Sequence, residues 1–231
     1  MVGVLTDYEV QALLLSLKVA AYAIFWLIPL GVFIAWVLAK KEFIGKNFLD
    51  SVIHLPLVLP PVVIGYLLLI TMGRQGLIGK WIYEHLDIVF SFNWKGAVLA
   101  CVVVALPLMV RSIRLSLEGV DHKLEQAAAT LGASPLKVFV TITLPLIIPG
   151  IITGTMLSFA RSLGEFGATI SFVSNIPGET QTIPLAMYSF IETPGSETAA
   201  MRLCVISIVI ALASMMLSEW MSRQTRQRLR G

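Results

Sequence analysis

Long apolar segments are the feature that most restricts how this chain can fold. Five of them cover residues 10–39, 52–72, 96–110, 136–160 and 203–221. A helix needs about 20 apolar residues to cross the roughly 30 Å hydrocarbon layer of a bilayer. Charged residues make up only 13% of the chain, well below the share usual in soluble domains. The sequence therefore predicts an all-α integral membrane protein with five transmembrane helices in a single domain over residues 1–231.

Proline and glycine interrupt two of these predicted spans. A proline inside a helix removes a backbone hydrogen bond and kinks the helix, so kinks are expected in the second and fourth spans. Gly150 and Gly154 stand four residues apart in the fourth span, a spacing that lets another helix approach closely. The interrupting prolines are Pro56, Pro60 and Pro61 in the second span and Pro145 and Pro149 in the fourth.

Lys and Arg residues are distributed unequally between the two sets of loops that five spans create. Such residues concentrate on the cytoplasmic side of membrane proteins. The richer set predicts a cytoplasmic C-terminus, a cytoplasmic loop over residues 111–135 and an N-terminus outside the cell. That set holds Lys40, Lys41, Lys46, Arg111, Arg114, Lys123, Lys137, Arg223, Arg226, Arg228 and Arg230, whereas the other holds Arg74, Lys80, Lys95 and Arg161.

Two segments on the expected outer side are less regular. Residues 77–87 carry apolar side chains at helical spacing with charged residues opposite, which predicts an amphipathic helix at the membrane surface. A cover for the membrane surface and a docking surface both fit this pattern. Residues 165–200 are broken by Gly and Pro, so we expect short helices in a re-entrant or outer-surface segment.

The cytoplasmic loop contains a short helix with clear start and stop signals. Asp121 is a suitable N-cap, and Gly132 suits the left-handed position that ends many helices. Ser134 and Pro135 then predict the start of the next helix. Between these signals lies a narrow face of small and apolar residues, formed by Leu124, Ala127, Ala128 and Leu131. On these signals alone, a helical connecting loop remains an alternative to a docking helix.

The same stretch resembles the loop signature of ABC-importer permeases, in which EAA, a glycine and an I-x-LP run recur at fixed spacing. The resemblance implies a coupling helix that inserts into a cytoplasmic ATPase subunit. One position departs from the signature, because Gln126 stands where the family has Glu and the carboxylate lies one residue earlier, at Glu125. The implied coupling residues are Glu125, Gln126, Ala127, Ala128, Leu131, Gly132, Ile142, Leu144 and Pro145.

Two further stretches resemble the oxyanion branch of these permeases, LPLVLPPVVIGYLLL and FARSLGEFGATISFVSNIPGETQTIP. Within that branch, both stretches are most similar to molybdate permeases, with sulfate or thiosulfate permeases as the alternative. The resemblance implies a multi-pass protein of the bacterial inner membrane that moves molybdate by alternating access, with tungstate as a second candidate anion. It also implies a homodimer, two ATPase subunits that bind ATP and Mg²⁺, and a periplasmic molybdate-binding protein. The apolar spans predict contact with membrane lipid, and the net charge of +3 fits cytoplasmic loops, so no nucleic-acid partner is expected.

A polar group at the outer end of the fourth span is a candidate for the translocation path or an outer gate. Its hydroxyl groups and helix breaks could supply hydrogen-bond donors to a passing dianion. Arg161 and Glu165 are four residues apart, so a structural ion pair is favoured over direct contact with the anion. The group consists of Arg161, Ser162, Gly164, Glu165, Gly167 and Thr169.

Several other functions lack support in the sequence. The stretch GRQGLIGKW has Trp81 where a phosphate-binding loop needs Ser or Thr, so we expect neither a bound cofactor nor ATP hydrolysis by this chain alone. The three histidines are scattered, and no metal site is expected. A secondary transporter driven by an ion gradient, or a membrane scaffold, remains a rival reading, but neither needs a loop that docks an ATPase.

Overall fold

The computed structural model describes the backbone of residues 5–230 and, apart from residue 218 and residues 225–230, their side chains. This part of the chain is helical and contains no strand. The predicted all-α membrane fold is confirmed. Among the described residues, four stretches are long and apolar enough to span a membrane, and a bent pair of helices makes up to five. The four are α1 (Asp7–Lys40), α5 (Trp94–Glu118), Pro135–Leu163, and Glu197–Gln224 within α11 (Glu197–Arg230).

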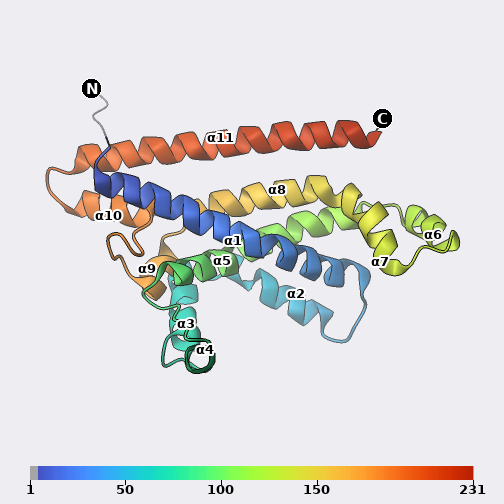
Figure 1. Cartoon of the computed structure of the whole chain (residues 1–231), viewed down its shortest axis with the longest axis horizontal. Coiled ribbons are helices and arrows are strands. Elements are labelled where there is room, and N and C mark those ends of the chain that lie inside the picture. The colour runs from blue at the N-terminus through green and yellow to red at the C-terminus, as the bar shows by residue number, and fades with distance from the viewer. Residues whose placement is uncertain (1–4, 231) are drawn as a thin grey trace.

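The long helices run side by side along the length of the molecule (Figure 1). α5 lies at the centre, packed between α1 and α8 (Leu144–Leu163), and the buried core includes Leu27, Met109 and Ile147. The predicted close approach at the glycine pair is confirmed. A Cβ added at Gly150 would lie 2.6 Å from the Cβ of Ser116 on α5, and one added at Gly154 would lie 2.9 Å from the sulfur of Met109.

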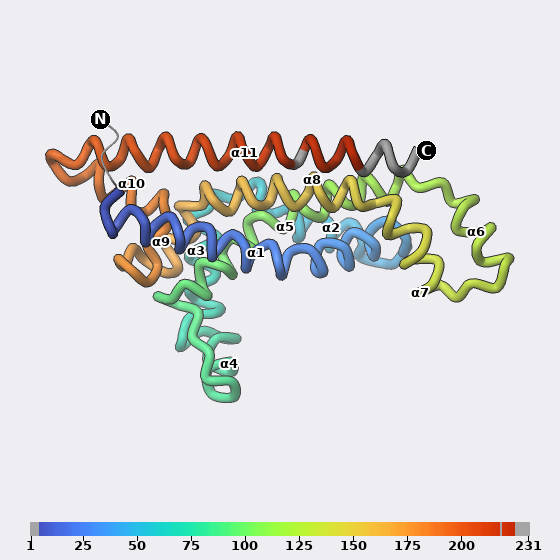
Figure 2. Tube along the Cα trace, turned by 45° about the horizontal axis from the view of Figure 1, so that its top comes forward, coloured from blue at the N-terminus to red at the C-terminus, as the bar shows by residue number. Residues whose placement is uncertain are grey.

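The second predicted span is broken rather than kinked. It consists of α2 (Lys46–His54), the 3₁₀ turn η1 (Leu55–Leu57) and α3 (Pro61–Met72), and its two halves are bent by 113°. Pro56, Pro60 and Pro61 lack the N–H groups that a continuous helix needs here, and Pro60 has extended backbone angles. As Figure 2 shows, α3 leaves the bundle sideways with α4 (Gly79–Leu86) at its tip, which is the helix expected within residues 77–87.

The helix α3 is held by a close crossing with α9 (Gly167–Val173). A Cβ at Gly65 would lie 2.5 Å from the carbonyl oxygen of Ala168, and a Cβ at Gly167 would lie 2.8 Å from the Cβ of Pro61. Glycine at both positions lets the two backbones touch. The expected short helices within residues 165–200 are α9 and α10 (Ile183–Glu192), and α9 buries Phe172 and Val173 against the core.

Three other spans are longer than expected. α5 continues to Glu118, so Arg111 and Arg114 lie in a helix and not in the loop that was expected from residue 111. The ion pair between Arg114 and Glu118, four residues apart, favours this extension. The fifth span, expected over 203–221, lies within α11, and the first, expected over 10–39, lies within α1.

The fourth span begins with α7 (Pro135–Val138) and passes through a π-helical turn, η2 (Phe139–Thr143), before α8. The amide of Leu144 donates to the carbonyl of Phe139, five residues earlier. Pro145 cannot donate a hydrogen bond, and its ring would clash with the carbonyl four residues before it in a regular α-helix. The wider π turn accommodates this proline, and such turns are frequent at functional sites.

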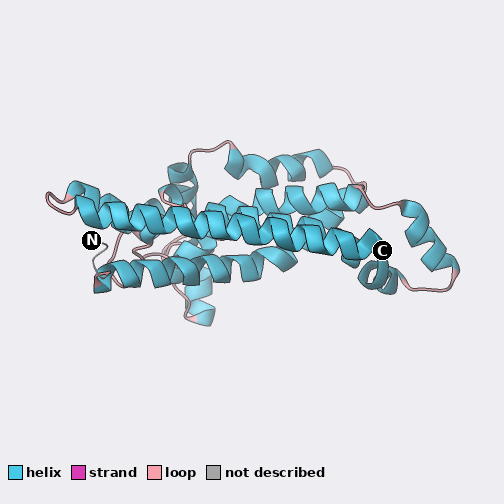
Figure 3. Cartoon of the chain, turned by 90° about the horizontal axis from the view of Figure 1, so that it is seen from above, coloured by secondary structure: helices cyan, strands magenta, loops and turns pink. Residues whose placement is uncertain are grey.

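The connections gather at two opposite ends of the molecule. One end carries the start of α1 together with α10, whereas the other carries α6 (His122–Thr130) and the end of α11 (Figure 1). Figure 3 shows the same arrangement from above, with the long helices running between these two ends. The segment that contains α6 and the segment that contains α10 therefore lie at opposite ends of the bundle, whereas α4 lies to its side.

Candidate functional site

The helix α6 is defined at both ends by the residues expected from the sequence. The carboxylate of Asp121 accepts a hydrogen bond from the amide of Lys123 at 2.9 Å. At the other end, Gly132 has φ +82°, and the amides of Gly132 and Ala133 donate to the carbonyls of Ala129 and Ala128. These two bonds form a Schellman motif, which requires a left-handed residue at the glycine position. The predicted helix and its glycine stop are confirmed.

The helix α7 starts as expected two residues further on. The hydroxyl of Ser134 accepts from the amide of Lys137 at 3.4 Å, and Pro135 occupies the first turn. A tight turn between α6 and α7 therefore folds from local signals alone, and α7 leads through the π turn into α8.

The surface of α6 is open to contact by another molecule. None of its residues, all of which the structure describes, is buried. Gln126 and Ala127 are exposed, Ala128 is half-buried, and the neighbouring Leu131 is 89% exposed. Figure 1 places α6 beyond the end of the long helices, where no other element covers it. The face of small and apolar residues that the sequence singled out is thus presented outward.

Glu125 differs from its neighbours because its side chain turns back toward the bundle. Its Oε2 lies 2.6 Å from Nζ of Lys40, the last residue of α1, and 3.2 Å from Nδ1 of His122. Its Oε1 accepts from the hydroxyl of Thr143 at 2.7 Å. Burial alone would raise the pKa of Glu125, but the hydrogen bonds from Lys40, Thr143 and His122 outweigh burial and hold that pKa below its usual value.

The residues of the loop signature therefore occupy two places. Gln126, which replaces the family Glu, faces outward on α6, while the carboxylate one position earlier is used internally. The I-x-LP run lies on the helix that enters the bundle. Ile142 is in the π turn, Leu144 begins α8 and packs on the core, and Pro145 follows it; all three are half-buried.

At the opposite end, Arg161 and Glu165 form the expected ion pair, with 2.6 Å between Nη1 and Oε2. The side chain of Glu165 is 1% exposed, and its Oε1 accepts from the amide of Ala168 at 2.7 Å. The pair thereby joins the end of α8 to the first turn of α9. Whether Arg161 also contacts an anion stays a prediction.

The other residues of this polar group lie in or beside the turn between α8 and α9, which we call the elbow. Gly164 ends α8, and Gly167 allows the close approach of α3. The hydroxyl of Thr169 donates to the carbonyl of Phe166 at 2.9 Å. Ser162 is buried, and its carbonyl accepts from the thiol of Cys101 at 3.7 Å. The structure brings all six residues together at one end of the bundle.

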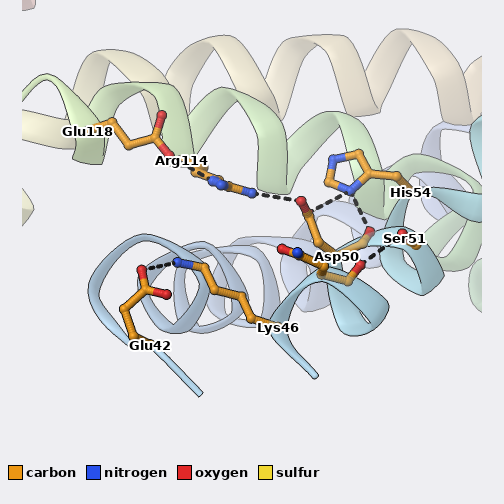
Figure 4. Close-up of polar contacts among 8 residues, drawn as sticks. Glu42, Lys46, Asp50, Ser51, His54, Arg114 and Glu118 are labelled. Atoms are coloured by element: carbon orange, nitrogen blue, oxygen red, sulfur yellow. Dashed lines mark hydrogen bonds and ion pairs between the residues drawn. The ribbon is translucent and has the colours of Figure 1, made fainter. Parts of the chain in front are cut away.

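A second polar cluster, between α2 and α5, was not found from the sequence (Figure 4). Arg114 donates to Asp50 at 3.0 Å and to Glu118 at 2.8 Å. Nδ1 of His54 lies 2.9 Å from the carbonyl oxygen and 3.1 Å from the carboxylate of Asp50, so this nitrogen carries the proton. The four-residue spacings of Asp50 to His54 and of Arg114 to Glu118 are visible in the sequence. The contact between Asp50 and Arg114, 64 residues apart, is not.

The described residues contain no cluster of three or more His, Cys, Asp or Glu side chains that could hold a metal ion. His54 and His122 each lie beside a single carboxylate, that of Asp50 and that of Glu125, and the two pairs share no common centre. Both cysteines are free thiols, with Cys101 buried and Cys204 half-buried. The described residues of the site thus form an exposed helix face on α6 and, at the other end, the ion-paired turn between α8 and α9.

Residues 27–229 match the model of the family described as binding-protein-dependent transport system inner membrane component, and the chain belongs to this family. The chain is 64% identical over 225 residues to the "Molybdenum transport system permease protein ModB" of Escherichia coli K12, covering 97% of this chain and 98% of that protein. It is 62% identical to the protein of the same name from Haemophilus influenzae, covering 96% of each. It is 39% identical to the "Sulfate transport system permease protein CysW" of Synechococcus elongatus, covering 85% of this chain and 69% of that protein.

Solved structures show the same fold. A bacterial alginate ABC transporter chain superposes with a TM-score of 0.76 at 16% identity, covering 95% of this chain and 80% of that chain. A chain of the MetNI methionine ABC transporter superposes with a TM-score of 0.67 at 12% identity, covering 94% of both. The chain is thus a multi-pass inner-membrane permease component with the fold of a type I ABC importer.

Proposed function

We propose that this chain is the membrane-spanning subunit of an ATP-driven importer of molybdate. The observation that carries the proposal is the near full-length likeness, at 64% identity, to a protein named for molybdenum transport. Tungstate is a tetrahedral dianion of nearly equal size, so we expect it to share the path. Relatives named for sulfate transport are less similar, which makes sulfate the second candidate.

The coupling to ATP is assigned to α6. Its open face of small residues lets another backbone approach closely, and its Schellman stop fixes the direction of the chain into α8. We propose that two copies of this chain form a dimer, each contacting one cytoplasmic ATPase subunit through α6. The ATPase subunits bind ATP and Mg²⁺, and a periplasmic binding protein delivers the anion.

This assignment also sets the orientation. Lys123 lies in α6 itself, and Lys40, at the end of α1, contacts Glu125 of α6, in keeping with a cytoplasmic position. The start of α1 then lies on the periplasmic side, as do α4, α9 and α10. The elbow of Arg161 and Glu165 belongs to the periplasmic half, where we propose that it stiffens an outer gate during alternating access.

Transport by the complete assembly in liposomes tests the proposal. Permease, ATPase and binding protein together should take up labelled molybdate only when ATP is supplied on the side of α6. Unlabelled tungstate should compete with this uptake, and an excess of sulfate should not, because a site shaped for one anion discriminates by differential affinity.

Equal competition by sulfate would show that the transporter accepts oxyanions in general and is not specific for molybdate. Uptake without ATP or without the ATPase subunits would instead favour a secondary transporter. The permease alone, incubated with ATP, serves as the control for hydrolysis by contaminating ATPases.

A further inference from the structure

Glu125 joins α6 to parts of the bundle that are distant in the sequence. Along the chain, α6 is connected only to α5, through residues 119–121, and to α7, through residues 131–134. The ion pair of Glu125 with Lys40 adds a link to the end of α1, across 85 residues. The hydrogen bond from Thr143 adds a link to the π turn below α8, across 18 residues.

Both links are sheltered from water although the rest of α6 is open. The side chains of Lys40 and Glu125 are 15% and 19% exposed, and Thr143 is buried. The three side chains, together with Trp36 and Phe139, line a pocket of about 270 Å³. Hydrogen bonds that involve a charged group are stronger than neutral ones, and partial burial reduces their screening by solvent. The contact is therefore stiffer than an exposed surface ion pair.

The two links reach two of the helices that pack on the central α5. Lys40 ends α1, and Thr143 immediately precedes α8. The π turn between α7 and α8 departs from regular helical geometry, because Pro145 follows it. A displacement of α6 is thus transmitted to α1 through Lys40 and to the π turn before α8 through Thr143. These two contacts act in addition to the loops that flank α6.

From this arrangement we infer that Glu125 is a positioning residue, which transmits the movement of α6 to α1 and α8 and does not itself contact the ATPase. The inference rests on the proposed function, because it takes α6 as the ATPase contact. It explains the shifted acid of the loop signature. The carboxylate at position 125 serves the internal link, while the outward position 126 is left with an uncharged amide.

The coupling ratio, molybdate transported per ATP hydrolysed, tests the inference in reconstituted complexes. Glu125→Gln should leave co-purification with the ATPase intact but lower this ratio about tenfold, because it weakens a charge-assisted contact. The exchanged pair Lys40→Glu with Glu125→Lys should recover most of the ratio. Glu84→Gln, which removes a carboxylate from an exposed pair on α4, is the matched control and should change nothing.

An unchanged ratio in Glu125→Gln would overturn the inference, as would loss of ATPase association in that variant with no recovery in the exchanged pair. Failure of the unmodified complex to couple ATP to uptake would instead refute the proposed function.

The contact itself can be tested without transport. Spin labels at Lys41→Cys and Lys123→Cys, in a background with Cys101→Ala and Cys204→Ala, report the distance between the end of α1 and the start of α6. One narrow distribution that broadens on Glu125→Gln supports the link. The same distance distribution with and without Glu125→Gln would overturn the inference.

Discussion

Ala127→Trp should leave the permease inserted in the membrane but abolish its co-purification with the ATPase subunits. The side chain of Ala127 is exposed on α6, so the chain itself has room for the larger residue. An ATPase surface that packs closely on the small-residue face does not. Central interface positions can contribute several kcal/mol, so we expect binding weaker by about a hundredfold or more. Ala128 is half-buried and would be a less clean site for the same test.

Gly132→Val tests the same docking surface through the backbone. An added Cβ at Gly132 meets nothing within 4 Å, so any effect comes from the φ of +82° and not from a clash. A β-branched residue is strongly disfavoured at such angles, whereas Asn tolerates them. We expect Gly132→Val to lose the ATPase and Gly132→Asn to retain it.

Leu77→Trp, at an exposed position near α4, is the control for the added bulk of Ala127→Trp. Normal stoichiometry in both Ala127→Trp and Gly132→Val would contradict the docking assignment.

Arg161→Gln should destabilise the protein and reduce molybdate uptake, while Arg161→Gln combined with Glu165→Gln should restore both. The single change leaves the carboxylate of Glu165 almost fully buried without its 2.6 Å partner. Removing one member of a buried pair costs about 3 kcal/mol or more. In the double variant, the amide oxygen at position 165 can still accept from the amide of Ala168 at the start of α9.

Thermal unfolding of the detergent-solubilised permease and uptake in liposomes measure the two effects separately. If the double variant recovers both stability and uptake, Arg161 and Glu165 neutralise each other and neither charge is needed to bind the anion. A double variant that regains its stability yet shows no uptake would contradict this reading, because Arg161 would then contact the anion directly.

The parts of the fold that the sequence predicts well are those set by neighbouring residues. The cap at Asp121, the stop at Gly132 and the ion pair of Arg161 with Glu165 each depend on residues a few positions apart. The glycine spacing in α8 also indicated where α5 approaches closely. In each case, local geometry determines the interaction once a helix forms.

The features that the sequence does not predict depend on pairing between distant segments. The prolines before α3 predict a kink, but not the bend of 113°, nor the close crossing of α3 and α9 at Gly65 and Gly167 that accompanies it. The contact of Asp50 with Arg114 and the contact of Lys40 with Glu125 join residues 64 and 85 positions apart. No local pattern shows which of the available charged residues will meet.

Site-specific photocross-linking gives the most direct test of the central claim, that α6 is where the ATPase binds. A benzophenone amino acid at position 127, in the assembled and transporting complex, should cross-link to the ATPase subunit. The same group at position 77, near α4 on the proposed periplasmic side, should not cross-link to the ATPase subunit. Absence of the cross-link from position 127 in an active complex, or an equal yield from position 77, would contradict the account.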